Sequence, residues 1–279
     1  MNQLMQDVRF SLRQLRRSPG FAVIVVLTLS LGIGAAAAVF SVIDAVLIRP
    51  LPFAHQDRLV FPDTKARSGY SQPWSYLSYL DARSELKTFD ELAGYSDFTK
   101  VNLEAPSGAV SLTAVKSTDN FFSVFGVKPI LGRTYVPGED QTGRDDVAVL
   151  SYEVWQTHFG AQVNAVGKVV RLDGAPYTVI GVMPSGFRFP MYERNAIYTP
   201  LHADPRWKTH RGAHWMRIVG LLKTDASRQQ AQADFVRVLA DIGRAYPEAD
   251  GGRTVNIVPL NAQVSADSDG PLKTLLLAV

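Results

Sequence analysis

The chain has 279 residues, 46% of them hydrophobic and 20% charged, and it contains no cysteine. This length can supply a membrane anchor and a globular core, while the lack of cysteine excludes disulfides, thiolate metal sites and cysteine nucleophiles. The formal charge of +3 comes from the first 20 residues, because the rest of the chain has 25 basic and 25 acidic residues. A neutral domain does not favour binding of nucleic acid.

Residues 1–20 predict an amphipathic helix at the cytoplasmic surface of a membrane. Apolar residues recur at helical spacing from Met5 to Leu15, and the adjoining face carries the basic side chains of Arg9, Arg13, Arg16 and Arg17. A solvated amphipathic helix is the alternative interpretation.

Residues 21–48 predict a transmembrane helix, because no ionisable side chain interrupts the sequence from Ser18 to Ile43. The arginines before this run place the N-terminus in the cytoplasm by the positive-inside rule, so the residues after it are expected outside. A signal peptide cleaved after Ala38 is the alternative. Cleavage there would leave the apolar residues from Val39 to Ile48 as an exposed tail, which argues against it.

Small residues recur every fourth position in this predicted span. Small side chains let two membrane helices approach closely. The pattern predicts packing against other transmembrane helices through two rows, Ser30, Gly34 and Ala38 in one, and Ala37, Ser41 and Ala45 in the other.

Residues 49–268 predict a mixed α/β extracytoplasmic domain with two lobes, so that the fold class of the whole chain is α+β with an N-terminal transmembrane helix. In its first half we expect a strand at 59–61 and a helix at 74–86, and the capping-box spacing of Thr88 and Glu91 predicts another helix. Two strands forming a hairpin and a short helical turn follow, at 96–104, 109–116 and 119–122.

The second half of this domain starts with a buried strand at 147–150 and a helix that Ser151 caps. A hairpin of 168–172 with 177–182 comes next, then a strand at 196–201. The order strand, helix, strand over 214–223, 227–246 and 254–260 predicts a βαβ crossover and a sheet that is at least partly parallel. Residues 269–279 are expected to begin a second, truncated transmembrane segment.

No constellation of catalytic residues was found, and we predict a chain that is not an enzyme and holds no cofactor or metal. His210 and His214 are four residues apart but lack the glutamate of a zinc protease motif, so they are interpreted as ordinary histidines. Four carboxylates near residue 140 predict a solvated acidic surface rather than a calcium site: Glu139, Asp140, Asp145 and Asp146.

The run from Gly34 to Pro52, GAAAAVFSVIDAVLIRPLP, resembles the first membrane helix and its exit in MacB-like ABC transporter permeases. Further segments resemble the same family in chain order: Asp119–Phe122, Gly126–Pro129, Leu131–Arg133, Glu139–Asp140, Val147–Ser151, Trp155, Phe159–Gly160, Val166–Gly167, Leu172–Gly174, Tyr177–Pro184 and Phe187–Pro190.

This resemblance implies a MacB-like periplasmic core domain on an FtsX-like permease of the bacterial inner membrane. It implies as partners a separate cytoplasmic ATP-binding subunit, the other transmembrane helices of a dimeric permease, and membrane lipid. Such permeases continue into further membrane helices, so the chain is expected to represent only their N-terminal part. The alternative functions are a secreted or anchored binding or scaffold module without an ATPase partner and, with less support, an extracytoplasmic hydrolase.

Overall fold

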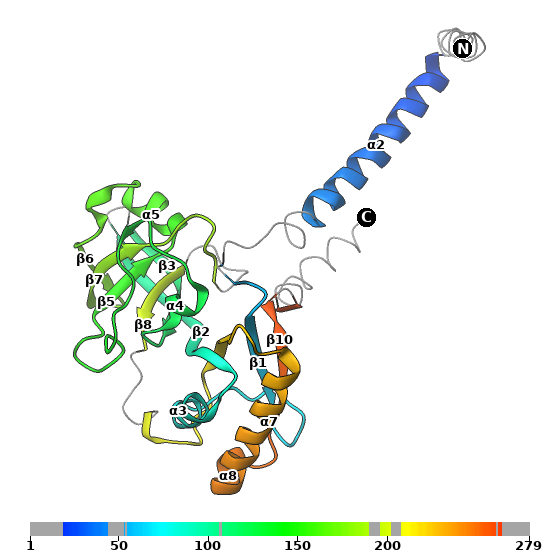
Figure 1. Cartoon of the computed structure of the whole chain (residues 1–279). Coiled ribbons are helices and arrows are strands. Elements are labelled where there is room, and N and C mark those ends of the chain that lie inside the picture. The colour runs from blue at the N-terminus through cyan, green and yellow to red at the C-terminus, as the bar shows by residue number, and fades with distance from the viewer. Residues whose placement is uncertain are drawn as a thin grey trace. The chain divides into compact units, whose positions relative to one another are not determined.

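The structure is a computed structural model of the chain, and it describes residues 19–43, 53, 55–105, 108–189, 196–201, 208–260 and 262–263. The chain divides into two compact units, which are described separately below. One consists of residues 1–50 with 268–279, and the other of residues 51–267 (Figure 1).

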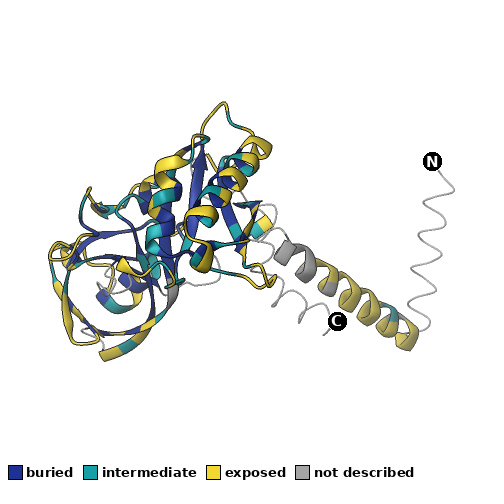
Figure 2. Cartoon of the chain, turned by 90° about the horizontal axis from the view of Figure 1, so that it is seen from below, coloured by how far each residue is buried: buried dark blue, intermediate teal, exposed yellow. Residues whose placement is uncertain are grey.

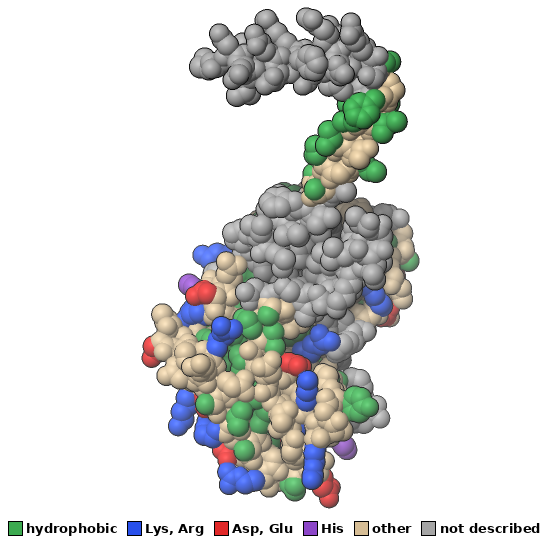
Figure 3. All heavy atoms as spheres, turned by 90° about the vertical axis from the view of Figure 1, so that its right-hand side faces the viewer, with side chains coloured by type: hydrophobic (Ala, Val, Ile, Leu, Met, Phe, Trp, Pro, Cys, Tyr) green, Lys and Arg blue, Asp and Glu red, His purple; other side chains and the backbone are tan. Residues whose placement is uncertain are grey.

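The described part of the first unit is one helix, α2 (Pro19–Ile43). Most of the large apolar side chains described between Phe21 and Ile33 are exposed, and no charged residue lies among them (Figure 3). Within the described residues, no helix was found that is long and apolar enough to cross a membrane. Most of the predicted cytoplasmic helix and the predicted second membrane segment lie outside the described residues.

The second unit contains a first lobe built on four antiparallel strands in the order β10-β1-β9-β2. The helix α3 (Tyr76–Glu85) connects β1 (Leu59–Lys65) to β2 (Phe89–Ala105), and α7 (Arg228–Ala245) connects β9 (Arg217–Leu222) to β10 (Thr254–Pro259). Each connection joins two strands that are separated by a third. This interleaving is the ferredoxin-like arrangement of two split βαβ units.

Both helices of the first lobe cover the same face of its sheet. α7 turns a stripe of apolar residues inward at helical spacing, and its N-terminus is fixed by a capping box between Ser227 and Gln230. Together with Tyr79 and Ala82 of α3, this stripe packs on the strand residues of a single hydrophobic core. Figure 2 shows the buried residues on the strands and the inner faces of the helices.

The second lobe is a small closed barrel. Its ring of strands runs from β2 through β3 (Gly108–Ser117), β8 (Ala196–Pro200), β5 (Val147–Leu150), β7 (Ala175–Val182) and β6 (Val169–Leu172). The ring closes because β6 pairs with β7 on one side and with Leu103 and Glu104 of β2 on the other. The 17-residue β2 therefore belongs to both lobes.

The remaining elements among the described residues of the second unit are short. They are α4 (Phe121–Phe125), β4 (Leu131–Gly132), α5 (Tyr152–Phe159), the 3-10 helix Val163–Ala165 and α8 (Pro247–Asp250). β4 pairs with β7 at Gly132 opposite Gly181, where a Cβ on Gly181 would lie 2.2 Å from the backbone oxygen of Arg133. Only glycine permits this close approach of two backbones.

Several local predictions from the sequence are confirmed. Both hairpins form, since β2 pairs with β3 and β6 pairs with β7 in antiparallel register. The helix predicted after Ser151 is α5, and Ser151 caps it by accepting a hydrogen bond from the Val154 N–H. The mixed α/β class of the domain is confirmed as well.

One prediction was wrong, and the predicted crossover is confirmed, although its two strands do not pair with each other. The capping-box pattern at 88–91 does not start a helix, because Thr88 bonds to Asp234 of α7 and Phe89 begins the long strand β2. The crossover from β9 to β10 exists, but β1 lies between these two strands and pairs antiparallel with both. The parallel pairs of the sheet are instead in the barrel, between β3 and β8 and between β5 and β7.

Candidate functional site

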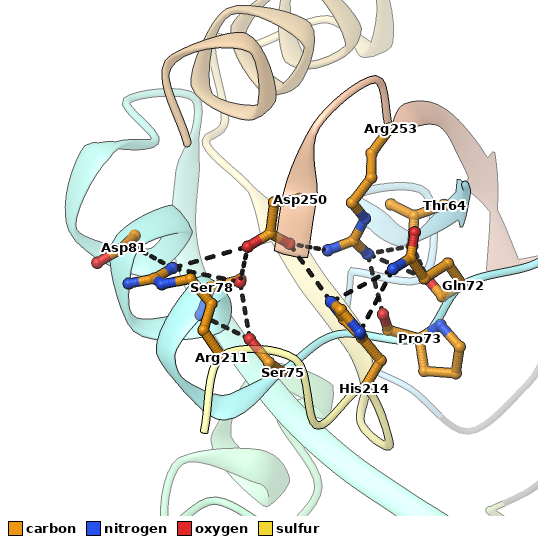
Figure 4. A network of polar contacts seen from close by, with 10 residues as sticks. All are labelled: Thr64, Gln72, Pro73, Ser75, Ser78, Asp81, Arg211, His214, Asp250 and Arg253. Atoms are coloured by element: carbon orange, nitrogen blue, oxygen red, sulfur yellow. Dashed lines mark hydrogen bonds and ion pairs between the residues drawn. The ribbon is translucent and has the colours of Figure 1, made fainter. Parts of the chain in front are cut away.

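A buried polar network joins α3, α8 and the segment before β9 in the first lobe (Figure 4). Its centre is Asp250, whose side chain is 0% exposed. One carboxylate oxygen, Oδ1, accepts a hydrogen bond of 2.7 Å from Arg253 Nη1 and lies 3.5 Å from His214 Nε2. The other, Oδ2, accepts a bond of 2.8 Å from Ser78 Oγ. We call these groups the Asp250 network.

Arg253 extends the Asp250 network toward β1. Its Nη2 donates to Thr64 Oγ1 at 3.0 Å and to the carbonyl oxygens of Gln72 and Pro73 at 3.1 and 3.0 Å. Its guanidinium also lies 4.7 Å from the ring centre of Trp74. A planar group with several donors suits this role. Arg253 therefore fixes the loop between β1 and α3.

The segment that returns from the barrel to β9 is attached to the same network. Arg211 Nη1 lies 2.7 Å from Asp81 Oδ2 on α3, and the guanidinium stacks 3.5 Å from the ring centre of Tyr246. Lys208 Nζ donates to the Asp140 carbonyl oxygen, 3.2 Å away in the second lobe. This segment is therefore held to both lobes.

The local sequence explains how Asp250 reaches its place. α8 is a single turn that follows α7 directly, and Gly243 and Gly251 leave room for the approach of its backbone. A Cβ on Gly243 would lie 3.1 Å from the Asp250 carbonyl oxygen. On the other side, Ser75 caps α3, so Ser78 in its first turn points at the carboxylate.

The Asp250 network contains serine, histidine and aspartate, but in an order that does not suit nucleophilic catalysis. In a catalytic triad the histidine lies between the other two and takes the serine proton. Here Asp250 lies between Ser78 and His214, and Ser78 is fully buried. The contacts instead clamp three backbone segments together. In the part of the chain that the structure describes, no group of three His, Asp or Glu residues is placed to hold a metal.

A second feature is a cluster of aromatic rings where the two lobes meet, which we call the aromatic cluster. Phe121 of α4 is fully buried and lies within 6.4 Å, centre to centre, of the rings of Tyr95, Phe122, Phe125, Phe189 and Tyr198. Tyr95 belongs to β2 and Tyr198 to the barrel strand β8. Phe53, just after the predicted membrane span, packs on Phe125 at 5.1 Å. The cluster thus fixes one lobe to the other.

A cavity of about 500 Å³ lies beside the aromatic cluster, between α3, β2, α4 and the 134–137 loop. Polar side chains line much of it, and they are bonded to one another. Glu91 Oε2 accepts hydrogen bonds from Asn120 Nδ2 at 2.9 Å and from Ser123 Oγ at 3.0 Å. These bonds tie α4 to β2 and add to the contact between the lobes.

The residues predicted for membrane packing and topology are only partly described. Ser30, Gly34 and Ala37 lie on α2 and are exposed. Ala38 and Ser41 lie on the same helix, with side chains outside the described residues, and Ala45, Arg9, Arg13, Arg16 and Arg17 lie outside them altogether. Their roles stay predictions.

The prediction of a solvated acidic surface near residue 140 was wrong. Glu139, Asp140 and Asp145 are buried, and Asp146 is exposed. Glu139 accepts bonds from Arg133 and from the Val136 N–H, and Asp145 accepts one from the Gly143 N–H. These carboxylates form hydrogen bonds within their own loop, and donors of that loop compensate their charges.

Two of these carboxyl groups, those of Asp250 and Glu139, have a pKa below the ordinary value. Burial by itself would raise the pKa of Asp250, but hydrogen bonds from His214, Ser78 and Arg253 outweigh it and hold the pKa below its ordinary value. Burial likewise would raise the pKa of Glu139, and the bonds from Arg133 and the Val136 N–H lower it on balance. Both carboxylates therefore favour the folded state when they are ionised.

Stability is expected to fall in acid for this reason. A carboxylate with a depressed folded-state pKa contributes stability above its unfolded pKa of about 4 and loses it as the pH falls through the folded value. Urea midpoints should stay level from about pH 7 to 5 and drop below about pH 4. Asp250→Asn should flatten this drop, whereas Asp90→Asn, at an exposed carboxylate, should not. Equal pH profiles for Asp250→Asn and the unmodified chain would contradict the assignment.

Comparison with known proteins matches this architecture to domains of membrane permeases. The chain belongs to the family of the MacB-like periplasmic core domain, whose model matches residues 22–238, and the resemblance drawn from its sequence motifs is confirmed. It is thus a MacB-like periplasmic domain of the ABC-type permease family. No curated protein was found to match it.

Solved structures share its fold, among them the two that follow. The periplasmic region of MacB from Actinobacillus actinomycetemcomitans is 16% identical with a TM-score of 0.55, and the match covers 78% of this chain and 92% of that one. The extracellular domain of the noncanonic ABC-type transporter YknZ from Gram-positive bacteria is 14% identical with a TM-score of 0.54, covering 71% and 99%. At these identities the likeness concerns the fold.

Proposed function

We propose that the chain is a permease subunit of an ABC-type export or mechanotransmission system. It works with a separate cytoplasmic ATP-binding subunit, as part of a dimeric permease. The match of the family model to residues 22–238 carries this proposal. The clamped, non-catalytic arrangement of the Asp250 network agrees with a domain that transmits or responds to movement and catalyses no reaction.

In this proposal, residues 21–48 anchor the chain in the inner membrane. Residues 1–20 lie in the cytoplasm, residues 49–268 form the periplasmic domain, and residues 269–279 begin a second membrane segment. The uncharged sequence and the exposed apolar side chains of α2 support lipid contact. Ser30, Gly34, Ala37, Ala38, Ser41 and Ala45 pack against the other membrane helices of the permease.

The mechanism couples the ATP-binding subunit to the outer domain through direct packing contacts. Nucleotide-driven movement of the ATP-binding subunit shifts the packed membrane helices, and the outer domain moves in response. Within that domain, β2, the aromatic cluster and the 208–216 segment join the lobes. These contacts make the two lobes move together.

The orientation can be tested directly because the chain has no cysteine of its own. In intact cells with a permeable outer membrane, a membrane-impermeant maleimide should label Ser68→Cys, in an exposed turn of the outer domain. It should not label Ser11→Cys until the inner membrane is opened. Labelling of Ser11→Cys in intact cells, or a mature chain that starts near Val39, would refute the proposed topology.

Helix packing can be tested with two glycines that lie on opposite faces of α2. Gly34 belongs to a small-residue row, and Gly32 is 200° away around the helix by the ordinary 100° per residue. Gly34→Leu should reduce co-purification of the ATP-binding subunit and the permease dimer by about tenfold, since a packing loss near 1.4 kcal/mol has that effect. Gly32→Leu should leave it unchanged. Equal effects would contradict packing through this row.

A further inference from the structure

The strand β10 forms an edge of the sheet in the first lobe. Among the described residues it pairs with β1 and with no other strand. An exposed strand edge presents unpaired N–H and C=O groups that can pair with another chain. The chain has no net charge after its first 20 residues, so charge repulsion between two copies does little to prevent such pairing.

The outward groups of β10 can be identified from its hydrogen bonds. Gln232 of α7 donates from Nε2 to the Val255 carbonyl oxygen at 2.7 Å and accepts, through Oε1, from the Ile257 N–H at 2.9 Å. Val255 and Ile257 lie opposite Thr64 and Pro62 of β1, and Pro62 has no N–H to give. These residues therefore direct their backbone groups away from β1.

The side chain of Gln232 thus lies along the outer edge of β10, where a neighbouring strand would lie. The carboxamide of Gln232 carries N–H donors and a C=O acceptor side by side, so it bonds to the Val255 carbonyl and the Ile257 N–H at once, as backbone groups of a neighbouring strand would. The next outward position on the same edge is Pro259, which cannot donate at all. The edge is therefore closed by a glutamine in its middle and a proline at its end.

The outward backbone groups of Val255 and Ile257, which Gln232 covers, can pair with the same groups of a second copy of the chain. If two copies of β10 lie antiparallel about a two-fold axis at Asn256, Val255 of each faces Ile257 of the other. Their N–H and C=O groups then form two hydrogen-bonded pairs. We propose that Gln232 is an edge-protecting residue, which prevents antiparallel pairing of β10 with β10 of a second copy of this chain.

The proposal is tested by cross-linking the full chain in detergent, with Asn256→Cys as the reporter on the proposed axis. Asn256 is exposed, and a non-hydrogen-bonded antiparallel pair has its Cα atoms about 4.5 Å apart, which suits a disulfide. With copper phenanthroline as oxidant, Gln232→Ala with Asn256→Cys should give several times more disulfide dimer than Asn256→Cys alone. This readout does not depend on dimer contacts elsewhere in the chain.

Three controls make the result specific. Gln229→Ala, at an exposed position on the same helix, should not increase the cross-link. Thr254→Cys, which is off the axis, should cross-link far less in the Gln232→Ala background. Gln232→Glu keeps the stem and its packing but sets a carboxylate oxygen against the Val255 carbonyl, so it should also raise cross-linking and decides the matter if the alanine variant fails to fold.

No increase in either folded Gln232 variant would overturn the proposal, and so would equal cross-linking at Thr254→Cys and Asn256→Cys. Because none of these outcomes depends on an ATP-binding partner, failure here leaves the proposed permease function unaffected.

Discussion

Replacing Asp250 with alanine is expected to lower the free energy of unfolding by about 3–5 kcal/mol, because it leaves a charged guanidinium buried without its partner. The side chains of Asp250 and Arg253 are 0% and 1% exposed, so solvent cannot substitute for the lost carboxylate. Urea unfolding of the full chain, followed by tryptophan fluorescence, measures the change. Trp74 lies against Arg253 and reports on this region.

The comparison variant is Asp90→Ala. Asp90 pairs with Arg58 at 3.1 Å but is 44% exposed, and Arg58 keeps its bonds to the Leu222 carbonyl and to Thr224. Exposed ion pairs contribute little, so this loss should stay below about 1 kcal/mol. Adding Arg253→Met to Asp250→Ala should restore part of the stability, since it removes the orphaned charge. Equal losses for Asp250→Ala and Asp90→Ala would show that the network is not a clamp.

Replacing Phe121 with alanine is expected to cost about 3–5 kcal/mol, the range for large aromatic side chains deleted from a core. Phe121 is 0% exposed and contacts rings from both sides of the lobe junction. The near-ultraviolet circular dichroism should also weaken, because Tyr95 and Tyr198 lose the neighbour that fixes their packing. Both changes are measured on the same sample, by urea titration and by the aromatic spectrum.

Tyr70→Ala is the matched control for this experiment. Tyr70 is 79% exposed, and the described bond that it makes uses its backbone carbonyl oxygen, which the substitution retains. Its removal should change stability by no more than about 0.5 kcal/mol. Phe121→Leu should fall between the two, since it keeps much of the buried volume. A loss at Phe121→Ala as small as at Tyr70→Ala would mean that the aromatic cluster does not hold the lobes together.

The elements that could be predicted from the sequence depend on contacts between near neighbours. Ser151 and Ser227 cap helices through bonds three residues away. The turn of the β6–β7 hairpin has Asp173 and Gly174 at positive φ, as a tight antiparallel hairpin needs. In such cases the residues that decide the structure lie within one short window, and local pattern is sufficient.

The architecture and the Asp250 network could not be predicted in this way because distant residues decide them. Thr88 has the spacing of a helix cap, yet Asp234 of α7 takes its hydrogen bonds and the chain continues as β2. Asp250 and Arg253 are three residues apart in the sequence, but Ser78 and His214 complete the site from other elements. The barrel closes through two residue pairs between β2 and β6, which no local pattern reveals.

β9 lies between β1 and β2, yet it is synthesised only after the whole barrel has been made. Synthesis adds about 5–20 residues per second, so β9 is made on the order of ten seconds after β1 and β2, the two strands that it joins. The barrel strands follow one another without that delay, so the second lobe can fold first and present β2 in extended form. The first lobe then assembles against the barrel that precedes it. A nascent chain stalled before β9 leaves Tyr79 and Ala82 of α3 without the β9 and α7 residues of their core, and so accessible to chaperones and proteases.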